Sequence, residues 1–594
     1  MHTLNSYLIP APLSALLTIM LGSSIAVISD HFGKRIIKDN TPIFRAMYFF
    51  AGLLALSWFT WIICLVSLAT TAVFKGLAAT TIIYAALLLL NKNSKSNSLR
   101  TLFSITFKRS KEGYLQVLLI LVFTCYLLLS LAVPTDADSL SYHLALPVDI
   151  LKNESLYFNP DNLHFRMAGF GEMLNLIGVA NGCPQLGAFI QVIGLGLVLY
   201  ALSKSIEFEQ RLDLVTIFLG IPVLLFLVPN QKHQLTGVLC TSLCFFHLSQ
   251  TDRFTKKQLT LFLSVLLFAA GIKYSFVLSF AALLLFFILK KPDGTTSFQF
   301  LVKLIFLGMT ILGPQILFKW LYLGDPLSPL LENLKTIPDP VIVKLHQYIK
   351  EYSDSSSPFP ANLIFVNSIG KISTVIGVSA LLIGLLPVLW RRFKWEVISI
   401  TSLIILILIG GQASSRFLLE PVLWSVPLFI TTFNLNRYYK FFILAARLQL
   451  FILVPFLIAG LYILMPSILS NSLREKVLLS SSNGYAESAW INNILPSNAR
   501  ICIASRSRAY LPRTYFPWEY LYFTSMATHQ EAEALDHKLK SEYKIDYIIL
   551  PPTGFEEIRS KYAGQIVAGP KKFFLATRNP LNTSEYEMVI YKMK

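Results

Sequence analysis

The sequence predicts a polytopic α-helical membrane protein with a small extracytoplasmic α/β domain at its C-terminus. Three observations support this fold class: the composition is strongly apolar, apolar runs follow one another along most of the chain, and basic charge alternates between the intervening loops. Of the 594 residues, 54% are hydrophobic and 14% are charged, and the mean hydropathy is +0.59. Because soluble domains carry about 25% charged residues, this composition indicates burial in a bilayer.

The apolar runs predict about 12 to 14 membrane spans. Several runs are shorter than the roughly 20 residues of a full span, so we expect those helices to extend into their flanks, to tilt or to break. The segment before the first run lacks a basic n-region, and we expect a retained span rather than a cleaved signal peptide. The runs cover residues 11–28, 47–70, 77–90, 115–133, 188–202, 214–228, 235–248, 259–270, 275–289, 301–318, 375–390, 397–410, 417–433 and 448–465.

The basic residues between these runs fall on every second loop. Cytoplasmic loops are enriched in lysine and arginine, so this alternation predicts the orientation of the chain, in what we expect to be a bacterial inner membrane. The net charge of +18 is therefore explained without nucleic acid, which we do not expect as a partner. The residues concerned are Lys34, Arg35, Lys38, Arg45, Lys92, Lys95, Arg100, Lys108, Arg109, Lys111, Lys204, Arg211, Arg253, Lys256, Lys257, Lys290, Lys291, Arg391, Arg392, Lys394, Arg437 and Lys440.

The opposite, extracytoplasmic side then carries two long loops, at residues 134–171 and 320–362, three short turns and the C-terminal tail. The turns contain His233, Lys273 and Arg416. The tail mixes short strand patterns with helical ones, which predicts a small α/β domain. Its expected strands are 500–504, 547–550, 573–576 and 588–591, and its expected helices are 486–494 and 531–542.

The densest group of polar residues follows the fourth run, in the loop that begins at residue 134. Ionisable residues are costly near a bilayer, so such a group indicates a functional site. Asp138 and Tyr142 are four residues apart, which puts both side chains on one face of a helix. Asp138 is either the N-cap of that helix or a general base that accepts a proton from an attacking hydroxyl or amine.

The motif Asp138-Ser-Leu-Ser-Tyr142-His143, directly after a span, resembles the first outer-loop motif of GT-C glycosyltransferases. It is most similar to the bacterial protein O-mannosyltransferase-like and aminoarabinose transferase-like branch. The resemblance covers the chain from about residue 134 onward and implies a catalytic Asp138, with Tyr142 and His143 binding substrate beside it. It divides the chain into an N-terminal transmembrane module (1–113), a catalytic transmembrane region (114–470) and the α/β domain (471–594).

Two further motifs fit the same family. The segment Gly271-Ile-Lys273-Tyr274 resembles a Gly-x-Lys-Tyr turn, in which Lys273 is a counter-charge for a lipid-linked phosphate or else reaches the headgroups as an interfacial lysine. The segment Gln412-Ala-Ser-Ser-Arg416-Phe417 resembles a late Gln-x-x-x-Arg-Tyr/Phe motif. Arg416 is expected to bind phosphate through two hydrogen bonds; its alternatives are an interfacial anchor or a pair with Glu420, one helical turn away.

The remaining polar candidates lie in the same outer loops. His164 and Arg166 are expected to line the acceptor side, and His233 fills the short turn 230–234 beside Lys232. Asp136 next to Asp138 is a candidate substrate ligand and would supply part of a metal site. A Mg²⁺ or Mn²⁺ site needs more carboxylates than this, so we predict no obligatory metal and no cofactor.

The tail contains a basic segment at residues 504–513, with Arg506, Arg508 and Arg513. Its position resembles the first strand and loop of the extracytoplasmic domains appended to such transferases. We interpret it as a solvated loop; the alternative is that its arginines face the membrane or an anionic glycan.

The function that the resemblance implies is transfer of a sugar from a polyprenyl-phosphate donor to an extracytoplasmic glycan, lipid or protein, with inversion. Asp138 deprotonates the acceptor, and Lys273 and Arg416 stabilise the leaving lipid phosphate. Three alternatives stay open: a polysaccharide polymerase or ligase, a transporter or flippase of lipid-linked sugars, and a non-catalytic assembly protein. A transporter predicts ionisable residues in the middle of spans, and these are scarce in the sequence.

Overall fold

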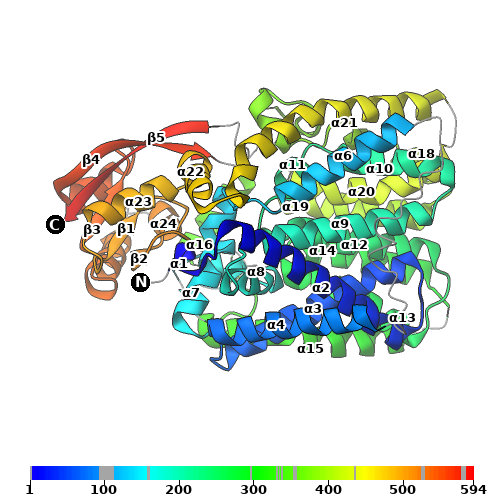
Figure 1. The fold of residues 1–594 in the computed structure, drawn as a ribbon, viewed down its shortest axis with the longest axis horizontal. Coiled ribbons are helices and arrows are strands. Elements are labelled where there is room, and N and C mark those ends of the chain that lie inside the picture. The colour runs from blue at the N-terminus through cyan, green and yellow to red at the C-terminus, as the bar shows by residue number, and fades with distance from the viewer. Residues whose placement is uncertain are drawn as a thin grey trace.

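The computed structural model describes residues 3–91, 113–156, 159, 161–293, 297–329, 332, 335, 339–351, 357–411, 413–433, 437–523, 529–576 and 583–594. Within them the chain forms a long helical body with a smaller α/β domain at one end (Figure 1). The basic loop predicted between residues 92 and 111 lies outside the described residues.

The helical body begins at the N-terminus and ends with α21. Its helices are α1 (Leu4–Tyr7), α2 (Ala11–Ile37), α3 (Pro42–Leu65), α4 (Thr71–Leu90), α6 (Gly113–Leu129), α7 (Ala145–Asn153), α8 (Phe170–Ala180), α9 (Leu186–Lys204), α10 (Arg211–Leu219), α11 (Leu224–Leu227), α12 (Gln234–Gln250), α13 (Lys256–Ile272), α14 (Phe276–Lys290), α15 (Ser297–Leu323), α16 (Pro340–Glu351), α17 (Leu381–Gly384), α18 (Leu386–Leu389), α19 (Lys394–Ile409), α20 (Ser415–Thr432) and α21 (Arg437–Leu464).

Six helical segments among the described residues are long and apolar enough to cross a membrane. These are α2, α3, α4, α9, α15 and the segment Tyr438–Ile468, which contains most of α21. The sequence predicts about 12 to 14 spans, and the remaining runs form shorter helices instead. The run 214–228, for example, divides into α10 and α11 at Pro222, because proline lacks the N–H that would continue a helix.

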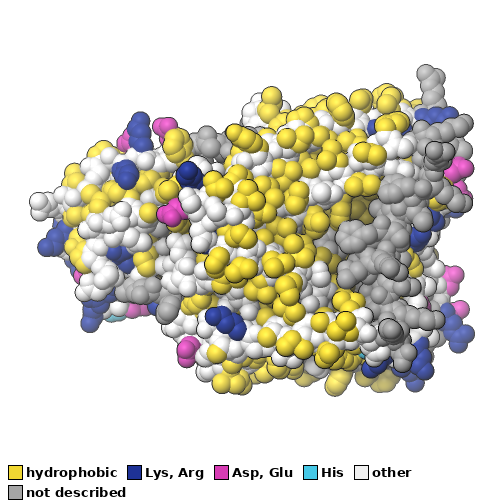
Figure 2. Space-filling view, in the orientation of Figure 1, with side chains coloured by type: hydrophobic (Ala, Val, Ile, Leu, Met, Phe, Trp, Pro, Cys, Tyr) yellow, Lys and Arg dark blue, Asp and Glu magenta, His cyan; other side chains and the backbone are white. Residues whose placement is uncertain are grey.

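The outer surface of the helical body is apolar. In α15 only 17% of the most apolar window is buried, whereas 72% of the corresponding window of α9 is buried. Phe306 and Met309 of α15 are 68% and 72% exposed, and Figure 2 shows hydrophobic side chains across the middle of the molecule. An exposed apolar belt of this kind matches what a bilayer covers.

The predicted basic loops meet at the end of the body away from the α/β domain (Figure 2). Lys257 Nζ donates to the Ile36 carbonyl at 2.8 Å, and Lys290 Nζ donates to the Ser249 carbonyl at 2.7 Å. Arg392 joins the same end through the Thr431 carbonyl, at 2.9 Å. Lys290 sits in the last turn of α14, where it also stabilises the negative end of the helix dipole.

The α/β domain follows α22 (Asn471–Ser481) and contains one five-stranded sheet, with strand order β2-β1-β3-β5-β4. The first three strands are parallel, and β5 is antiparallel to both β3 and β4. The prediction of an α/β domain is confirmed. Its elements are α23 (Tyr485–Ile494), β1 (Ile501–Ile503), β2 (Tyr515–Phe516), α24 (Trp518–Phe523), α25 (His529–Asp536) continued by a π-helix (His537–Glu542), β3 (Tyr547–Leu550), α26 (Glu556–Tyr562), β4 (Ala563–Ala576) and β5 (Thr583–Met593).

The α/β domain is fastened to the helical body by backbone hydrogen bonds. The N–H groups of Arg508 and Ala509 both donate to the Leu140 carbonyl at 3.1 Å, and Asn483 N–H donates to the Thr135 carbonyl at 2.9 Å. Leu4 N–H donates to the Ala509 carbonyl at 2.8 Å. The N-terminus, the loop after α6 and the segment after β1 therefore meet at one point.

The predicted sidedness leads to a labelling test. The six native cysteines are all buried, so cysteines introduced at the exposed positions Asn40 and Ser560 are the sites that a maleimide reaches. We expect a membrane-impermeant maleimide to label Ser560→Cys in intact cells and to label Asn40→Cys only after permeabilisation, because basic loops stay cytoplasmic. The reverse pattern would contradict the orientation.

Candidate functional site

The loop after α6 folds around Asp136, which lies two residues before Asp138. Asp136 Oδ1 accepts a hydrogen bond from Ser139 N–H at 2.9 Å, as an N-cap does. Burial raises the pKa of Asp136 to about 6. The capping role that the sequence leaves open for Asp138 is therefore taken by Asp136, and the Asp138 side chain makes no cap hydrogen bond.

Directly after Asp138 the chain forms one turn of π-helix, Ser139–His143, before α7 begins. The hydrogen bond from Leu144 N–H to the Ser139 carbonyl, 2.9 Å, spans five residues. Such wide turns are uncommon and are frequent at functional sites. The turn leaves the Leu140 carbonyl available to the two N–H groups of the α/β domain described above.

The Asp138 carboxylate lies among three cationic side chains. Lys232 Nζ donates to Oδ2 at 2.8 Å, and Arg506 Nη2 donates to Oδ1 at 2.8 Å. Arg416 Nη1 lies 3.9 Å from Oδ2. The side chains of Asp138, Lys232 and Arg416 are 12%, 5% and 14% exposed, so these charges interact with little screening by water.

Each of these cations is held by its own local structure. Lys232 belongs to the turn between α11 and α12, where Gln231 N–H donates to Ser139 Oγ at 2.9 Å. Arg416 lies in the first turn of α20, and its carbonyl accepts from Gln234 Nε2 at 2.9 Å. Arg506 lies in the segment after β1, which is fixed to the π-helix at Leu140.

Lys273 is a fourth basic residue near this group. It lies in the turn between α13 and α14, outside both helices, with its Nζ 5.3 Å from the centre of the Phe417 ring. Burial lowers the pKa of Lys273 well below its usual value, and the positive charges of Lys232 and Arg416 lower it further. The structure thus brings the Asp138, Lys273 and Arg416 motifs together. We call Asp138, Lys232, Lys273, Arg416 and Arg506 the charged cluster.

The aromatic and histidine candidates lie beside the charged cluster. The Tyr142 ring stacks on the His164 ring, with centroids 5.1 Å apart. His143 Nδ1 is 2.5 Å from Glu172 Oε1 in a buried pair, and burial lowers the pKa of His143. His233 Nε2 is 3.0 Å from Asn175 Oδ1.

Two candidates contact the second outer loop and its helix. Arg166 Nη1 lies 3.7 Å from Asp339 Oδ2, and the Tyr274 ring faces Lys319 Nζ at 3.9 Å. Lys319 Nζ in turn donates to the Arg166 carbonyl at 2.5 Å. These contacts connect the start of α14 and the end of α15 to the loop that carries His164.

Sequence reasoning missed Lys232 and Arg506 as parts of the cluster. The interpretation of residues 504–513 as a solvated loop is wrong, because Arg506 binds Asp138 and the side chains of Arg508 and Arg513 are almost fully buried. Glu420 is not the partner of Arg416; it accepts from Ser279 Oγ at 2.7 Å. Among the described residues, no group of three or more His, Cys, Asp or Glu side chains is arranged to hold a metal ion.

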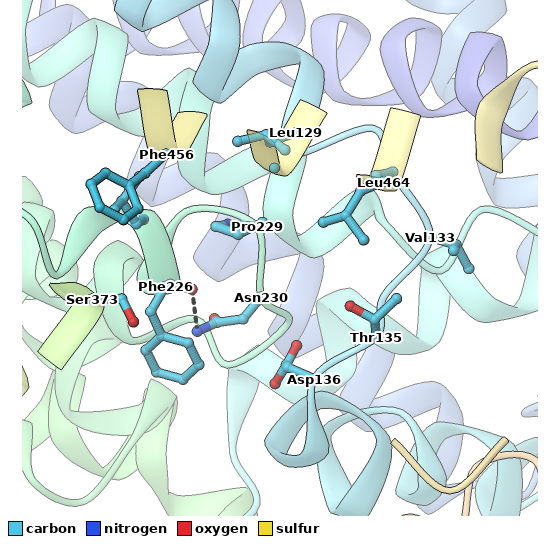
Figure 3. Close-up of a pocket in the computed structure, with 13 residues that line it drawn as sticks. Leu129, Val133, Thr135, Asp136, Phe226, Pro229, Asn230, Ser373, Phe456 and Leu464 are labelled. Atoms are coloured by element: carbon cyan, nitrogen blue, oxygen red, sulfur yellow. Dashed lines mark hydrogen bonds between the residues drawn. The ribbon is translucent and has the colours of Figure 1, made fainter. Parts of the chain in front are cut away.

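A cavity lies next to Asp136 and Asn230, each two residues before a member of the charged cluster, with a volume of about 700 Å³ when its open side is counted. Figure 3 shows Thr135 and Asp136 on one side of it and Phe456 on the other. Asn230, whose Nδ2 donates to the Phe226 carbonyl at 2.9 Å, also lines it. The full lining is Leu129, Ala132, Val133, Thr135, Asp136, Leu225, Phe226, Pro229, Asn230, Ser373, Phe456, Gly460 and Leu464.

This combination defines a class of protein: a body of apolar helices long enough to cross a membrane, with a charged site at one end completed by an α/β domain. The model of the DUF1420 N-terminal domain family matches residues 55–478, and the chain belongs to that family. The matched residues include Asp138, Lys232, Lys273 and Arg416 and end before Arg506.

Among solved structures, the chain is similar to the archaeal oligosaccharyltransferase AglB from Archaeoglobus fulgidus, in complex with an inhibitory peptide and a dolichol-phosphate. The match has 12% identity and a TM-score of 0.40 and covers 75% of this chain and 70% of that chain. This score is too low to assign a shared fold. Among curated proteins, none matches this chain.

Arg508 provides a test of how the α/β domain is held. Its Nη2 donates to the Ser141 carbonyl at 3.1 Å and to Asn162 Oδ1 at 3.3 Å. We expect Arg508→Ala to destabilise the docked domain by about 1.5–3 kcal/mol, the value of hydrogen bonds to charged groups, and to speed hydrogen exchange at residues 139–143. The control is Arg500→Ala, because Arg500 and its partner Asp546 are both more than 40% exposed. Equal hydrogen exchange at residues 139–143 in the two variants would contradict the docking role of Arg508.

Glu487 gives a pH test of packing inside the α/β domain. Its Oε2 accepts from Tyr586 OH at 2.7 Å, it also bonds Ser505, and burial raises its pKa from 4.5 to about 7. The native state therefore favours the neutral acid, so this stabilisation is complete below about pH 4.5 and is lost as the pH rises through about 7. We expect the Tm of the wild type to fall between pH 5.5 and 8 and that of Glu487→Gln to fall less. Parallel pH profiles would refute the assignment.

Proposed function

We propose that the protein is a GT-C-type membrane glycosyltransferase that moves a sugar from a polyprenyl-phosphate donor to an extracytoplasmic acceptor. The observation that carries this proposal is the charged cluster, in which Lys232, Arg416 and Arg506 lie within 3.9 Å of the single carboxylate of Asp138. Lys273 lies close by, against the Phe417 ring. Such an excess of positive charge at a buried site attracts an anion. Arginine and lysine are the side chains that bind phosphate oxygens most effectively.

The position of the cluster favours a phosphate that is attached to a lipid. The cluster lies at one end of the helical body, beside helices whose outer faces are apolar. A lipid phosphate occupies the same boundary in a bilayer. A soluble phosphate would need no such position.

The neighbouring cavity suits the lipid part of the donor. Its lining is largely apolar and includes Asp136 and Asn230. In the chain, Asp138 of the cluster is two residues after Asp136, and Lys232 is two residues after Asn230. A donor with its phosphate in the cluster therefore has an apolar space within reach for its first isoprenoid units.

In the proposed reaction Asp138 is the general base. The acceptor oxygen or nitrogen attacks the anomeric carbon, the bond from that carbon to the phosphate oxygen breaks, and the acceptor proton passes to Asp138. The lipid phosphate leaves with the electron pair, and its charge is neutralised by Lys232, Lys273 and Arg416. Attack from the side opposite the leaving group inverts the anomeric configuration.

The acceptor side of the site is assigned to Tyr142, His143, His164, Arg166, His233 and Tyr274 as candidate ligands. His164, which is half-buried and stacks on the buried Tyr142 ring, is the aromatic ring against which a sugar or a peptide can lie. A glycan, a lipid and a protein all remain acceptors compatible with these side chains. A polysaccharide polymerase or ligase would use the same donor chemistry and differs from this proposal in its acceptor.

A flippase would need charged groups along a path between the two ends of the body. The charged cluster instead gathers at one end, which favours chemistry at the boundary over transport. We further propose that the protein resides in a bacterial inner membrane, with the cluster and the α/β domain outside the cytoplasm.

The proposal is tested in the native host by deleting the gene and following lipid-linked sugars by mass spectrometry. We expect the deletion to accumulate an unconsumed polyprenyl-phosphate sugar, and the wild-type gene to remove it. Asp138→Asn should fail to do so, because loss of a general base costs about 100-fold or more in rate. Full complementation by Asp138→Asn, at normal protein levels, would show that Asp138 is not the base.

A further inference from the structure

The Asp138 carboxylate is occupied in the state that the structure describes. Lys232 donates to one oxygen and Arg506 to the other, both at 2.8 Å. A carboxylate held in two such charge-assisted hydrogen bonds is a weak proton acceptor, because both contacts favour its ionised form. Loss of one of these contacts would therefore make Asp138 a better proton acceptor.

Arg506 is the contact that is easiest to release. Its side chain is 40% exposed, whereas that of Lys232 is 5% exposed. Moving the guanidinium away from Asp138 leaves it in contact with water, whereas moving Lys232 would leave a buried charge without compensation.

The backbone that carries Arg506 is fixed. Ser507 Oγ is hydrogen-bonded to Asn483 Oδ1, Ser505 bonds the buried Glu487, and Arg508 N–H donates to the Leu140 carbonyl. A rigid backbone with a long, partly exposed side chain allows the guanidinium to change partners without movement of the domain.

We propose that Arg506 is a phosphate ligand that the α/β domain supplies to the site, and that it moves from Asp138 to the donor phosphate when the donor binds, which releases the base. This inference rests on the proposed function, since the phosphate is that of the lipid donor. The exchange keeps the guanidinium paired with an anion throughout, and phosphate oxygens match its planar pair of N–H donors. Donor binding and activation of the base are then one event.

In this exchange the Asp138 carboxylate and the donor phosphate compete for the Arg506 guanidinium. Without the carboxylate, Arg506 no longer has to leave a partner before it binds the donor. We therefore expect Asp138→Asn to bind a lipid phosphate more tightly than the wild type, although it does not transfer sugar. If Asp138 only contributed a contact to the donor, Asp138→Asn would instead bind the lipid phosphate more weakly than the wild type.

The test uses the full-length protein in nanodiscs, with farnesyl phosphate and farnesyl diphosphate as lipid probes and inorganic phosphate as the headgroup alone. We expect Arg506→Gln to weaken binding of the lipid phosphates about 10- to 100-fold, which corresponds to the loss of one hydrogen bond between charged groups. Arg506→Lys should retain most of the affinity. Arg500→Ala, which removes an equal charge from the surface of the same domain, should bind as the wild type does.

A second measurement separates binding from a structural effect of the substitution. Arg506→Gln should cost more affinity in the Asp138→Asn background than in the wild type, because there Arg506 has no carboxylate to leave. Hydrogen exchange at residues 139–143 should be unchanged by Arg506→Gln, which leaves the backbone contacts at Leu140 intact.

The outcomes distinguish this inference from the proposed function. If the wild type binds a farnesyl phosphate and Arg506→Gln binds it equally well, or if Asp138→Asn weakens binding, the role of Arg506 is overturned and the proposed function stands. If the wild type binds neither lipid probe, the proposed function fails and this inference fails with it. Inorganic phosphate bound as tightly as the lipid probes would overturn the assignment to a lipid-linked ligand.

Discussion

The carboxylate of Asp138 joins three parts of the chain that are far apart in sequence. Lys232 comes from a turn within the helical body, Arg416 from the start of α20, and Arg506 from the α/β domain. A lysine as buried as Lys232 needs a nearby negative charge, because an uncompensated buried cation is costly. The turn, the helix and the domain therefore share one anion, and the geometry of the boundary site depends on it.

Backbone hydrogen bonds fix the positions of the segments that carry these partners. The π-helical turn after Asp138 presents the Leu140 carbonyl to two N–H groups of the α/β domain, and Asp136 caps the start of the same turn. Because Asp138 lies between the Asp136 cap and the Leu140 contact, its backbone loses little further conformational entropy when a ligand binds. Pre-organisation of this kind is what stabilisation of a phosphate leaving group requires.

Local patterns in the sequence predicted the parts of the site that belong to single turns. Asp138, Lys273 and Arg416 each stand out as ionisable residues next to an apolar run, and alternating basic charge puts them on one side. Lys232 also stands next to an apolar run, but its pairing with Asp138, like that of Arg506, depends on contacts across 94 and 368 residues of sequence. In the α/β domain, strand β3 was predicted at its observed residues, because a short β-branched and aromatic run is a local property.

The number of spans was harder to predict, because composition does not determine where an apolar run breaks. The run 214–228 is uniformly apolar yet divides at Pro222 into α10 and α11, and the run 375–390 forms short turns instead of one helix. Apolar helices in this chain face either neighbouring helices, as most of the apolar window of α9 does, or the outer surface, as most of that of α15 does. Hydropathy alone cannot distinguish these two environments.

The attachment of the α/β domain also has a consequence for biosynthesis. A ribosome makes Asp138 and Lys232 long before it makes Arg506, and the ion pair that closes the cluster forms only when the last part of the chain has folded. Until then the carboxylate has Lys232 and Arg416 but lacks Arg506, and the loop after α6 lacks its contacts at Leu140. The site is therefore finished only once the α/β domain has folded against the helical body, and a chain truncated before residue 506 lacks the Arg506 contact with Asp138.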